Sequence, residues 1–283
     1  MAKNRSVASR IKRGLLTVLA ALISLLFLLP VLWLLASAFR TSAETAASSS
    51  PLSWWVLWPH EFTLVNVRSA ISVGFFSALS NSIMVATVTV IVGLGISALA
   101  AFALAVIPFR GRSAIFSIMV LSFLVPFEAI AIPLARSFGD WGLDNTLIAL
   151  ILPGLGNGLA VFTLRQFFLG IPPSLSEAAH LDGAGWFRVF WSVYLPLTRP
   201  ALIGAGLILF LFQWQAYLWP ILVVHSQELD LAPVALSRSF GSLTSDYGQV
   251  FAETTFLAII PAIALLVLQR YFVASVALSG SKE

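Results

Sequence analysis

Six long apolar stretches separate the polar parts of this chain. Each reaches or exceeds the roughly 20 residues that an α-helix needs to cross about 30 Å of hydrocarbon. They lie near 14–39, 75–107, 113–133, 146–168, 201–224 and 251–274. Because the bilayer interior offers no hydrogen bonds to the backbone, a span must satisfy its own backbone groups, as a helix does. The sequence predicts an all-α membrane protein with six transmembrane helices, in one domain covering 1–283.

The overall composition agrees with a bilayer as the solvent. Hydrophobic residues make up 59% of the chain and charged residues only 10%, too few to cover a soluble domain of this length. The chain has no cysteine, which excludes disulfides, thiolate metal sites and thiol nucleophiles. The net charge of +4 comes from short clusters between apolar stretches, so nucleic acid is not an expected partner.

The basic residues between the stretches predict the orientation of the chain. Twelve of the sixteen fall on one side of the predicted membrane, and the positive-inside rule makes that side cytoplasmic. We expect a multi-pass protein of the bacterial cytoplasmic (inner) membrane, with both termini and the 171–200 loop in the cytoplasm and 40–74 outside. Trp54, Trp55 and Trp58 are then interfacial anchors. The twelve are Lys3, Arg5, Arg10, Lys12, Arg13, Arg110, Arg112, Arg165, Arg188, Arg199, Arg270 and Lys282.

The 171–200 loop contains the signals for a first short helix. Pro172 and Pro173 end the preceding helix. Ser174, followed three residues later by Glu177, forms the pattern of a capping box that starts a new one. Asp182 and Gly183 end this helix after about two turns, because glycine readily adopts the left-handed conformation found there.

A second short helix is predicted over Trp186–Leu195, before Pro196 and Pro200 break the chain. The loop is therefore a helix-turn-helix. On the first helix Ala178 and Ala179 form a smooth surface for docking of another protein. On the second, four rings at helical spacing are expected to hold the loop against the bundle. They are Phe187, Phe190, Trp191 and Tyr194. The alternative is an amphipathic helix on the membrane surface, which normally carries more Lys and Arg.

Polar residues inside the apolar stretches are candidates for a translocation pathway, because such residues are costly in a membrane. Glu128 follows Pro126 in the third stretch, where a broken helix can expose a carboxylate; a hydrogen-bonded Glu near the interface is the alternative. The fifth stretch pairs amides with aromatic rings, which suits polyhydroxylated ligands, although packing between helices explains the same pattern. Its residues are Gln213, Trp214, Gln215 and Tyr217.

No catalytic or metal-binding pattern is recognisable. His60, His180 and His225 lie in separate loops without a second ligand at suitable spacing. The sequence has no GxxxxGK[ST] loop and none of the common hydrolase motifs. We expect the chain not to be an enzyme by itself and to hold neither metal nor cofactor, so any ATP chemistry belongs to a partner.

The 171–200 loop resembles the EAA motif of binding-protein-dependent ABC importer permeases. The resemblance rests on Glu177-Ala178-Ala179, on Gly183 four positions later and on Leu195-Pro196 at the end of the loop. Other stretches are similar to the maltose-type carbohydrate permeases, in particular to the six-span partner of a permease pair. They are Asn81-Ser82, AAFALAVIPFRGR at 100–112, IPL at 132–134, IPPSLSEAAHLDGA at 171–184, WQAYLWP at 214–220 and the ending at 269–283. Gln215 departs from the pattern, which usually has Asn after the tryptophan.

The resemblance implies a function and a set of partners. The EAA loop would seat in a groove of a cytoplasmic ATPase subunit, with seven residues in that contact: Glu177, Ala178, Ala179, Asp182, Gly183, Leu195 and Pro196. The partners would be a second homologous permease, two ABC ATPase subunits that hold ATP and magnesium, an extracytoplasmic solute-binding protein and membrane lipid. The cargo would be a sugar or related polyol.

Other functions remain open at the level of sequence. The same importer could carry a glycerophosphodiester, an amino acid or a peptide. An ion-coupled secondary transporter would use Glu128 as its coupling carboxylate. An intramembrane enzyme or a structural scaffold would leave the EAA pattern without a role.

Overall fold

The computed structural model describes residues 2–49, 51, 53–241 and 246–280, without the side chains of 2–11, 49, 54 and 271–280. Of the residues used above to assign orientation and anchoring, the side chains of Lys3, Arg5, Arg10 and Trp54 and the whole of Lys282 lie outside this description. All regular secondary structure among the described residues is helical.

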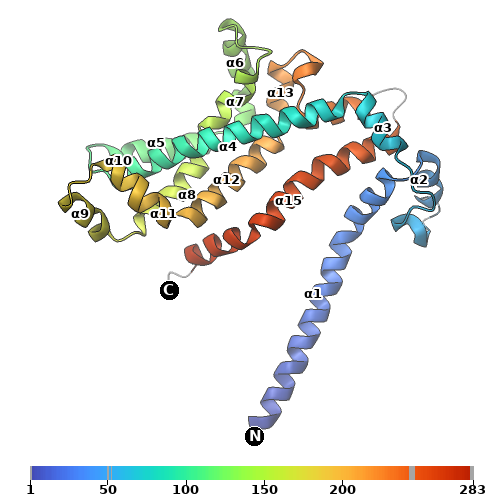
Figure 1. The fold of residues 1–283 in the computed structure, drawn as a ribbon, viewed down its shortest axis with the longest axis horizontal. Helices are drawn as coiled ribbons and strands as arrows, with labels where there is room; N and C mark the ends of the chain where they lie inside the picture. Colours follow the sequence, from blue (N-terminus) through green and yellow to red (C-terminus); the bar gives the residue numbers. More distant parts are fainter. Residues whose placement is uncertain (1, 50, 52, 242–245, 281–283) are drawn as a thin grey trace. The chain divides into compact units, whose positions relative to one another are not determined.

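The helices follow one another along the chain, with several short ones between the long spans (Figure 1). They are α1 (Ala2–Ala38), α2 (Ser42–Ser49), η1 (Trp54–Leu57), α3 (Val65–Ser72), α4 (Phe75–Ala105), α5 (Arg112–Phe123), α6 (Phe127–Asp140), α7 (Leu147–Ile151), η2 (Leu152–Leu155), α8 (Gly158–Leu169), α9 (Pro173–Leu181), α10 (Trp186–Val189), η3 (Phe190–Tyr194), α11 (Leu195–Leu197), α12 (Arg199–Trp214), α13 (Leu218–Val223), η4 (Gln227–Leu229), α14 (Ala232–Phe240) and α15 (Tyr247–Gly280).

Four helical segments are long and apolar enough to cross a membrane by themselves. They are Lys12–Ala38, Phe75–Ala105, Leu147–Leu169 and Tyr247–Arg270, close to four of the six predicted spans. Two further pairs of helices, Arg112–Phe123 with Phe127–Asp140 and Trp186–Leu197 with Arg199–Trp214, pass the same test together but are bent by 94° and 84°. The described residues therefore give six spans if each bent pair counts as one, in agreement with the predicted all-α membrane protein.

The predicted spans over 113–133 and 201–224 are each divided between two helices, and the third stretch has the break expected at Pro126. In the third stretch the helix stops at Phe123 and resumes after Pro126, because the residue before a proline is pushed towards an extended backbone. In the fifth, α12 ends at Trp214 and α13 begins at Leu218. A continuous helix there would need an N–H that Pro220 lacks and would bring its ring against the carbonyl of Ala216.

The chain divides into two compact units, 1–75 with 236–256 and 76–235 with 257–283. In the first unit the amide of Asn66 closes the C-terminal end of α1. Its Nδ2 donates to the carbonyls of Ser37, Ala38 and Arg40 at 3.3, 3.2 and 2.7 Å. These carbonyls have no partner within the helix, so the buried amide satisfies groups that the end of α1 leaves open.

Two further residues make the end of α1 a tightly built region. The guanidinium of Arg40 is fully buried, and its Nη2 donates to Ser37 Oγ at 2.8 Å and to the Val56 carbonyl at 3.0 Å. Burial lowers the pKa of Arg40, an effect that the nearby Glu44 carboxylate opposes. Gly248 lies so close to Asn66 that a Cβ there would be 2.7 Å from Asn66 Cγ.

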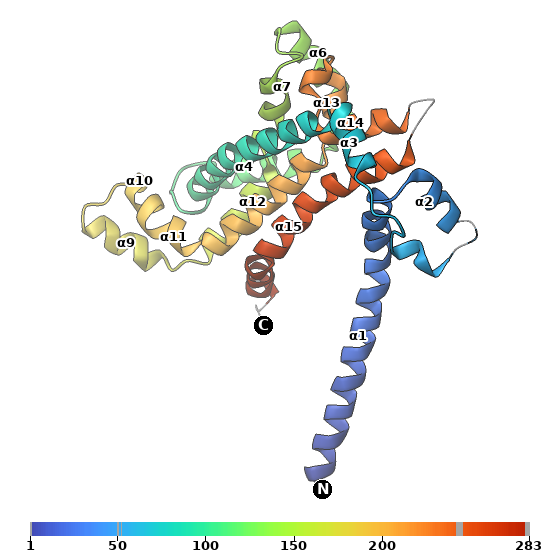
Figure 2. The ribbon, with the colours of Figure 1, turned by 45° about the vertical axis from the view of Figure 1, so that its right-hand side comes forward.

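In the second unit α4 and α12 run beside each other (Figures 1 and 2). Helices α9–α11 lie beyond one end of this pair, and α6, α7 and α13 form a separate group. A buried apolar cluster lies at each of these two places. One contains Phe102, Phe168, Phe190 and Tyr194, and the other contains Phe138, Leu150, Trp219 and Leu231.

Candidate functional site

The first helix of the 171–200 loop, α9, begins two residues earlier than the capping box requires. Pro173 occupies its first position and Pro172 is the N-cap, without a side-chain hydrogen bond. The predicted capping box of Ser174 and Glu177 is therefore wrong. The physical reason is that proline has the backbone angle of a helix start and lacks the N–H that a cap would satisfy.

The end of α9 is as predicted. Asp182 is its C-cap, and Gly183 has a left-handed backbone with φ +77°. The Gly183 N–H donates to the His180 carbonyl at 3.0 Å, and the Ala184 N–H donates to the Ala179 carbonyl at 2.9 Å. These bonds close the helix in the manner of a glycine-terminated cap.

The two sides of α9 differ in exposure. Glu177 and Ala178 are exposed, and Leu181 on the same side exposes 91% of its surface. Ser176 is buried, and Ala179 packs against the buried apolar cluster that contains Phe102. Ala179 therefore does not lie beside Ala178 on the open side. The outer side of α9 thus offers a carboxylate, a methyl group and a large apolar side chain to solvent or to another protein.

The second helix of the loop is continuous through α10, η3 and α11 and contains one π-helical turn over Phe190–Tyr194. The predicted break at Pro196 is wrong, because the chain bends only at Thr198, where it turns by 84° into α12. The backbone is wider in the π turn shortly before Pro196. This helps the helix to accommodate proline, which has no N–H. Leu195 is half-buried, and Pro196 is exposed.

Only two of the four predicted aromatic residues hold the loop against the bundle. Phe190 and Tyr194 expose 4% and 2% of their surfaces, whereas Phe187 and Trp191 expose 72% and 61%. Phe187 and Trp191 stack on each other, with ring centroids 6.4 Å apart. The four residues form two pairs, each with a spacing of four residues. Phe190 and Tyr194 face the core, whereas Phe187 and Trp191 do not.

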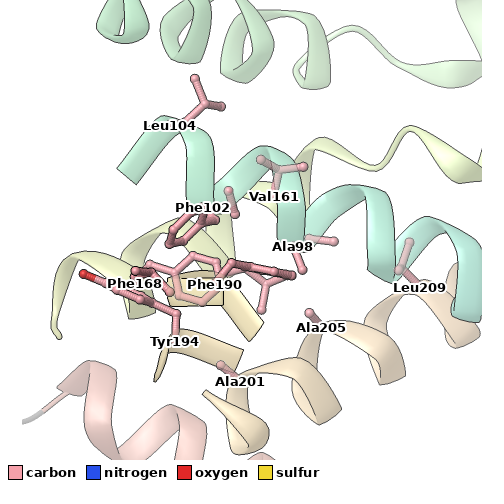
Figure 3. Close-up of a cluster of buried hydrophobic side chains, with 14 residues drawn as sticks. Ala98, Phe102, Leu104, Val161, Phe168, Phe190, Tyr194, Ala201, Ala205 and Leu209 are labelled. Atoms are coloured by element: carbon pink, nitrogen blue, oxygen red, sulfur yellow. The ribbon is translucent and has the colours of Figure 1, made fainter. Parts of the chain in front are cut away.

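Phe102 of α4 is the centre of the buried aromatic cluster (Figure 3). Its ring centroid lies 5.2 Å from those of Phe190 and Tyr194, 6.2 Å from that of Phe168 on α8 and 6.5 Å from that of Trp186 on α10. Phe102 therefore joins the loop to α4, while Tyr194 also contacts Phe168 of α8 directly, with ring centroids 5.7 Å apart. The sequence holds only a weak signal for this role: Phe102 is the one aromatic residue between Phe76 and Phe109.

The candidate pathway residues of the fifth stretch do not share one surface. Gln213 and Trp214 are buried, and Trp214 Nε1 donates to the Leu257 carbonyl at 3.1 Å. Gln215 and Tyr217 are exposed at the break between α12 and α13. A Cβ at Gly154 would lie 2.7 Å from Gln213 Oε1, so this amide is tightly packed. Gln213 and Trp214 are therefore packed within the chain, whereas the side chains of Gln215 and Tyr217 are exposed.

Glu128 lies in the first turn of α6 and is exposed. A carboxylate at this position interacts favourably with the positive end of the helix dipole. Glu253, in contrast, is fully buried on α15, where its Oε1 accepts from Gln249 at 2.8 Å and from Ser239 at 3.1 Å.

Two polar residues at the start of α4 have a role that sequence analysis did not predict. Asn81 Nδ2 donates to the carbonyls of Glu228 and Asp230 at 2.8 and 3.1 Å. Ser82 Oγ accepts from the Ala232 N–H at 2.8 Å. They fix the segment between η4 and α14 against α4. No group of three acidic or histidine side chains in the described part of the chain is placed to hold a metal ion.

Comparison with known proteins identifies the family. The family model for the binding-protein-dependent transport system inner membrane component matches residues 92–278. The arabinooligosaccharides transport system permease protein AraQ of Halalkalibacterium halodurans is 31% identical over 277 residues, 97% of this chain and 98% of the relative. The sn-glycerol-3-phosphate transport system permease protein UgpE of Agrobacterium fabrum is 36% identical over 210 residues, 73% of this chain and 74% of the relative.

The fold matches that of a solved importer structure. A bacterial ABC transporter involved in the import of the acidic polysaccharide alginate contains a chain with a TM-score of 0.79 and 23% identity, covering 94% of this chain and 98% of that one. Both the family match and the identity to full-length relatives confirm the resemblance inferred from the EAA motif. The chain therefore belongs to the family of binding-protein-dependent transport system inner membrane components, the permease subunits of ABC importers.

Proposed function

We propose that this chain imports a sugar or related polyol by alternating access, driven by ATP hydrolysis in separate ATPase subunits. The observation that carries the proposal is the construction of the loop. Its helix α9 has an open side with Glu177, Ala178 and Leu181, and the rest of the loop is packed through Phe102 against the spanning helix α4. A partner bound to the open side can therefore move a membrane span.

In this mechanism the loop transmits motion and performs no chemistry. Two ATPase subunits that close on ATP draw together the grooves in which the loops sit, and the attached helices change from inward-open to outward-open. ATP and magnesium are held by the ATPase subunits, because this sequence has no phosphate-binding loop of the GxxxxGK[ST] type. The contact consists of Glu177, Ala178, Asp182 and Gly183 on the outside, with Ala179, Leu195 and Pro196 holding their shape.

The remaining components follow from the same proposal. The chain pairs with a second, homologous permease in the bacterial cytoplasmic membrane, surrounded by lipid. A solute-binding protein delivers the cargo from outside, and a solved transporter with a similar fold is in complex with an alginate pentasaccharide-bound periplasmic protein. Both termini and the 171–200 loop are cytoplasmic, as the excess of basic residues on that side favours.

A carbohydrate is the cargo that the relatives favour. Similar permeases are named for arabinooligosaccharides, lactose and starch degradation products. Exposed Gln215 and Tyr217 at the α12–α13 break could bind hydroxyl groups and stack on sugar rings. A second cargo is sn-glycerol 3-phosphate, because permeases named for it are 36% and 35% identical to this chain.

The test is to purify the chain with its associated subunits and reconstitute the complex in lipid. ATP hydrolysis and uptake are then measured with the binding protein loaded with arabinotriose, maltotriose, lactose or sn-glycerol 3-phosphate. We expect one carbohydrate to stimulate both, and stimulation by sn-glycerol 3-phosphate alone would select the second cargo. Failure of any ATPase to co-purify would contradict the proposal. Uptake that needs a proton gradient but no ATPase would favour an ion-coupled transporter that uses Glu128.

A further inference from the structure

His180 lies at the C-terminal end of α9, half-buried and away from the open side of the helix. Its Nδ1 is 2.7 Å from the carbonyl oxygen of Ala184, beyond the turn that ends α9. A carbonyl can only accept a hydrogen bond, so Nδ1 carries the hydrogen. The other ring nitrogen, Nε2, is buried and has no hydrogen-bond partner within the described residues.

The ring of His180 also contacts the second helix of the loop. It lies edge-on to the indole of Trp186, with centroids 4.3 Å apart and an interplanar angle of 76°. Trp186 in turn contacts Phe102, the centre of the aromatic cluster, at 6.5 Å between centroids. Contacts between neighbouring side chains therefore run from α9 through His180 and Trp186 to α4.

The turn between α9 and α10 needs such a restraint. Gly183 and Gly185 lie within it, and a Cβ at either position would meet no atom within 4 Å. Glycine has more backbone freedom than any other residue, so these two positions are the points at which the turn can bend. The backbone hydrogen bonds of Gly183 and Ala184 and the packing of Ala184 against the apolar cluster hold one side of the turn, and the contacts of His180 add to them in fixing the direction of α9 relative to α10.

We propose that His180 is a positioning residue for energy coupling: its hydrogen bond to Ala184 holds the end of α9 on the turn beside Trp186, so that a pull on α9 reaches α4. The inference rests on the proposed function, because it assigns a component of the same loop. Without this restraint α9 would turn about the glycines, and motion of the bound ATPase would be absorbed in the loop.

Three substitutions separate the hydrogen bond from the ring. His180→Asn keeps a donor on the atom that follows Cγ, where Nδ1 lies, but loses the ring that contacts Trp186. His180→Phe keeps a ring against Trp186 but has no donor. His180→Ala removes both. Because the proposal assigns the restraint to the hydrogen bond, Asn should preserve it, whereas Phe and Ala should not.

The chain has no cysteine, so a single reporter can be introduced without altering the background. Leu218→Cys places it at the exposed start of α13, outside the residues proposed to bind the cargo. The reconstituted complex is treated with a water-soluble maleimide before and after trapping with ATP and orthovanadate. The change in labelling rate is divided by the ATP hydrolysed, and co-purification of the ATPase subunits confirms that each variant assembles.

We expect the nucleotide-dependent change in labelling to fall about threefold to tenfold in the Phe and Ala variants, the population shift that loss of one neutral hydrogen bond produces. The Asn variant should respond like the parent that carries only Leu218→Cys. Equal responses in all four chains, or an Asn variant as impaired as Ala, would overturn the role of His180 and leave the proposed function intact. A parent without any response to nucleotide would instead contradict the proposed function itself.

Discussion

The ring of Phe102 on α4 lies nearly perpendicular to the ring of Tyr194 in η3, with centroids 5.2 Å apart and planes at 72°. Edge-to-face pairs of this kind stabilise a contact beyond the area they bury. The pair connects the 171–200 loop to a spanning helix, at the position where force from an ATPase would enter the bundle. Its removal should therefore affect coupling more than folding.

Phe102→Leu should lower solute uptake per ATP hydrolysed while the complex still assembles. Leucine fills much of the space of the ring, which limits the loss of stability, but it cannot contact four aromatic rings at once. The measurement is uptake and phosphate release by the same proteoliposomes. Phe212→Leu, at an exposed position on α12, is the control and should leave the ratio unchanged. Equal ratios for both variants would show that Phe102 only fills the core.

Glu177→Lys should abolish uptake and weaken co-purification of the ATPase subunits, while the chain remains in the membrane. The side chain is exposed on α9, so charge reversal costs little in folding and acts on the docked partner. Membrane content is measured by immunoblot and assembly by pull-down. Ser174→Lys introduces the same charge at another exposed position of α9. If it were equally harmful, the effect would belong to charge on the loop in general and not to Glu177.

Gly183→Val should impair transport, whereas Gly185→Val should be tolerated. Both sites have open space around a new Cβ, but Gly183 has φ +77° and Gly185 has φ −73° and ψ 166°, a region that suits valine. A left-handed backbone costs an L-residue roughly 1–2 kcal/mol, with β-branched residues the least tolerant. Uptake by the two variants in the same vesicles checks the difference. Wild-type uptake by Gly183→Val would show that the turn does not require its left-handed residue.

Asn66→Ala should destabilise the region at the end of α1, because three carbonyls lose the Asn66 donor. The expected cost is about 1–3 kcal/mol, seen as a lower Tm in detergent. Gly248→Ala should also destabilise, through its close approach to Asn66. The double variant should lose less than the sum, since the shorter side chain of Asn66→Ala leaves room for the new methyl group. Additive losses would show that the two residues do not interact.

The long spans and the family could be predicted from the sequence because both depend on features that persist along the chain. Hydropathy locates four spans within a few residues, and the EAA pattern identifies the permease family. The end of α9 at Asp182 and Gly183 was also predictable, since glycine has a specific use at that position.

The errors arose where neighbouring proline residues or the direction of a side chain decides the outcome. The break between α12 and α13, before Pro220, interrupts a stretch whose apolar composition looks continuous. Phe187 and Phe190 are the same residue type, yet Phe187 is exposed and Phe190 is buried, because they point to different sides of the helix. The aromatic contacts of Phe102 involve residues far along the chain, from Phe168 to Tyr194, which a single sequence does not connect.

The 84° bend at Thr198 would determine how the loop acts on the fifth span in the proposed transport cycle. Because α10–α11 meets α12 almost at a right angle, displacement of the loop along its own axis would move the first turn of α12 sideways. The span would then tilt, with little sliding along its length. Tilting of a helix changes its match to the bilayer thickness at only a modest cost, so the membrane would offer little resistance to each transport cycle.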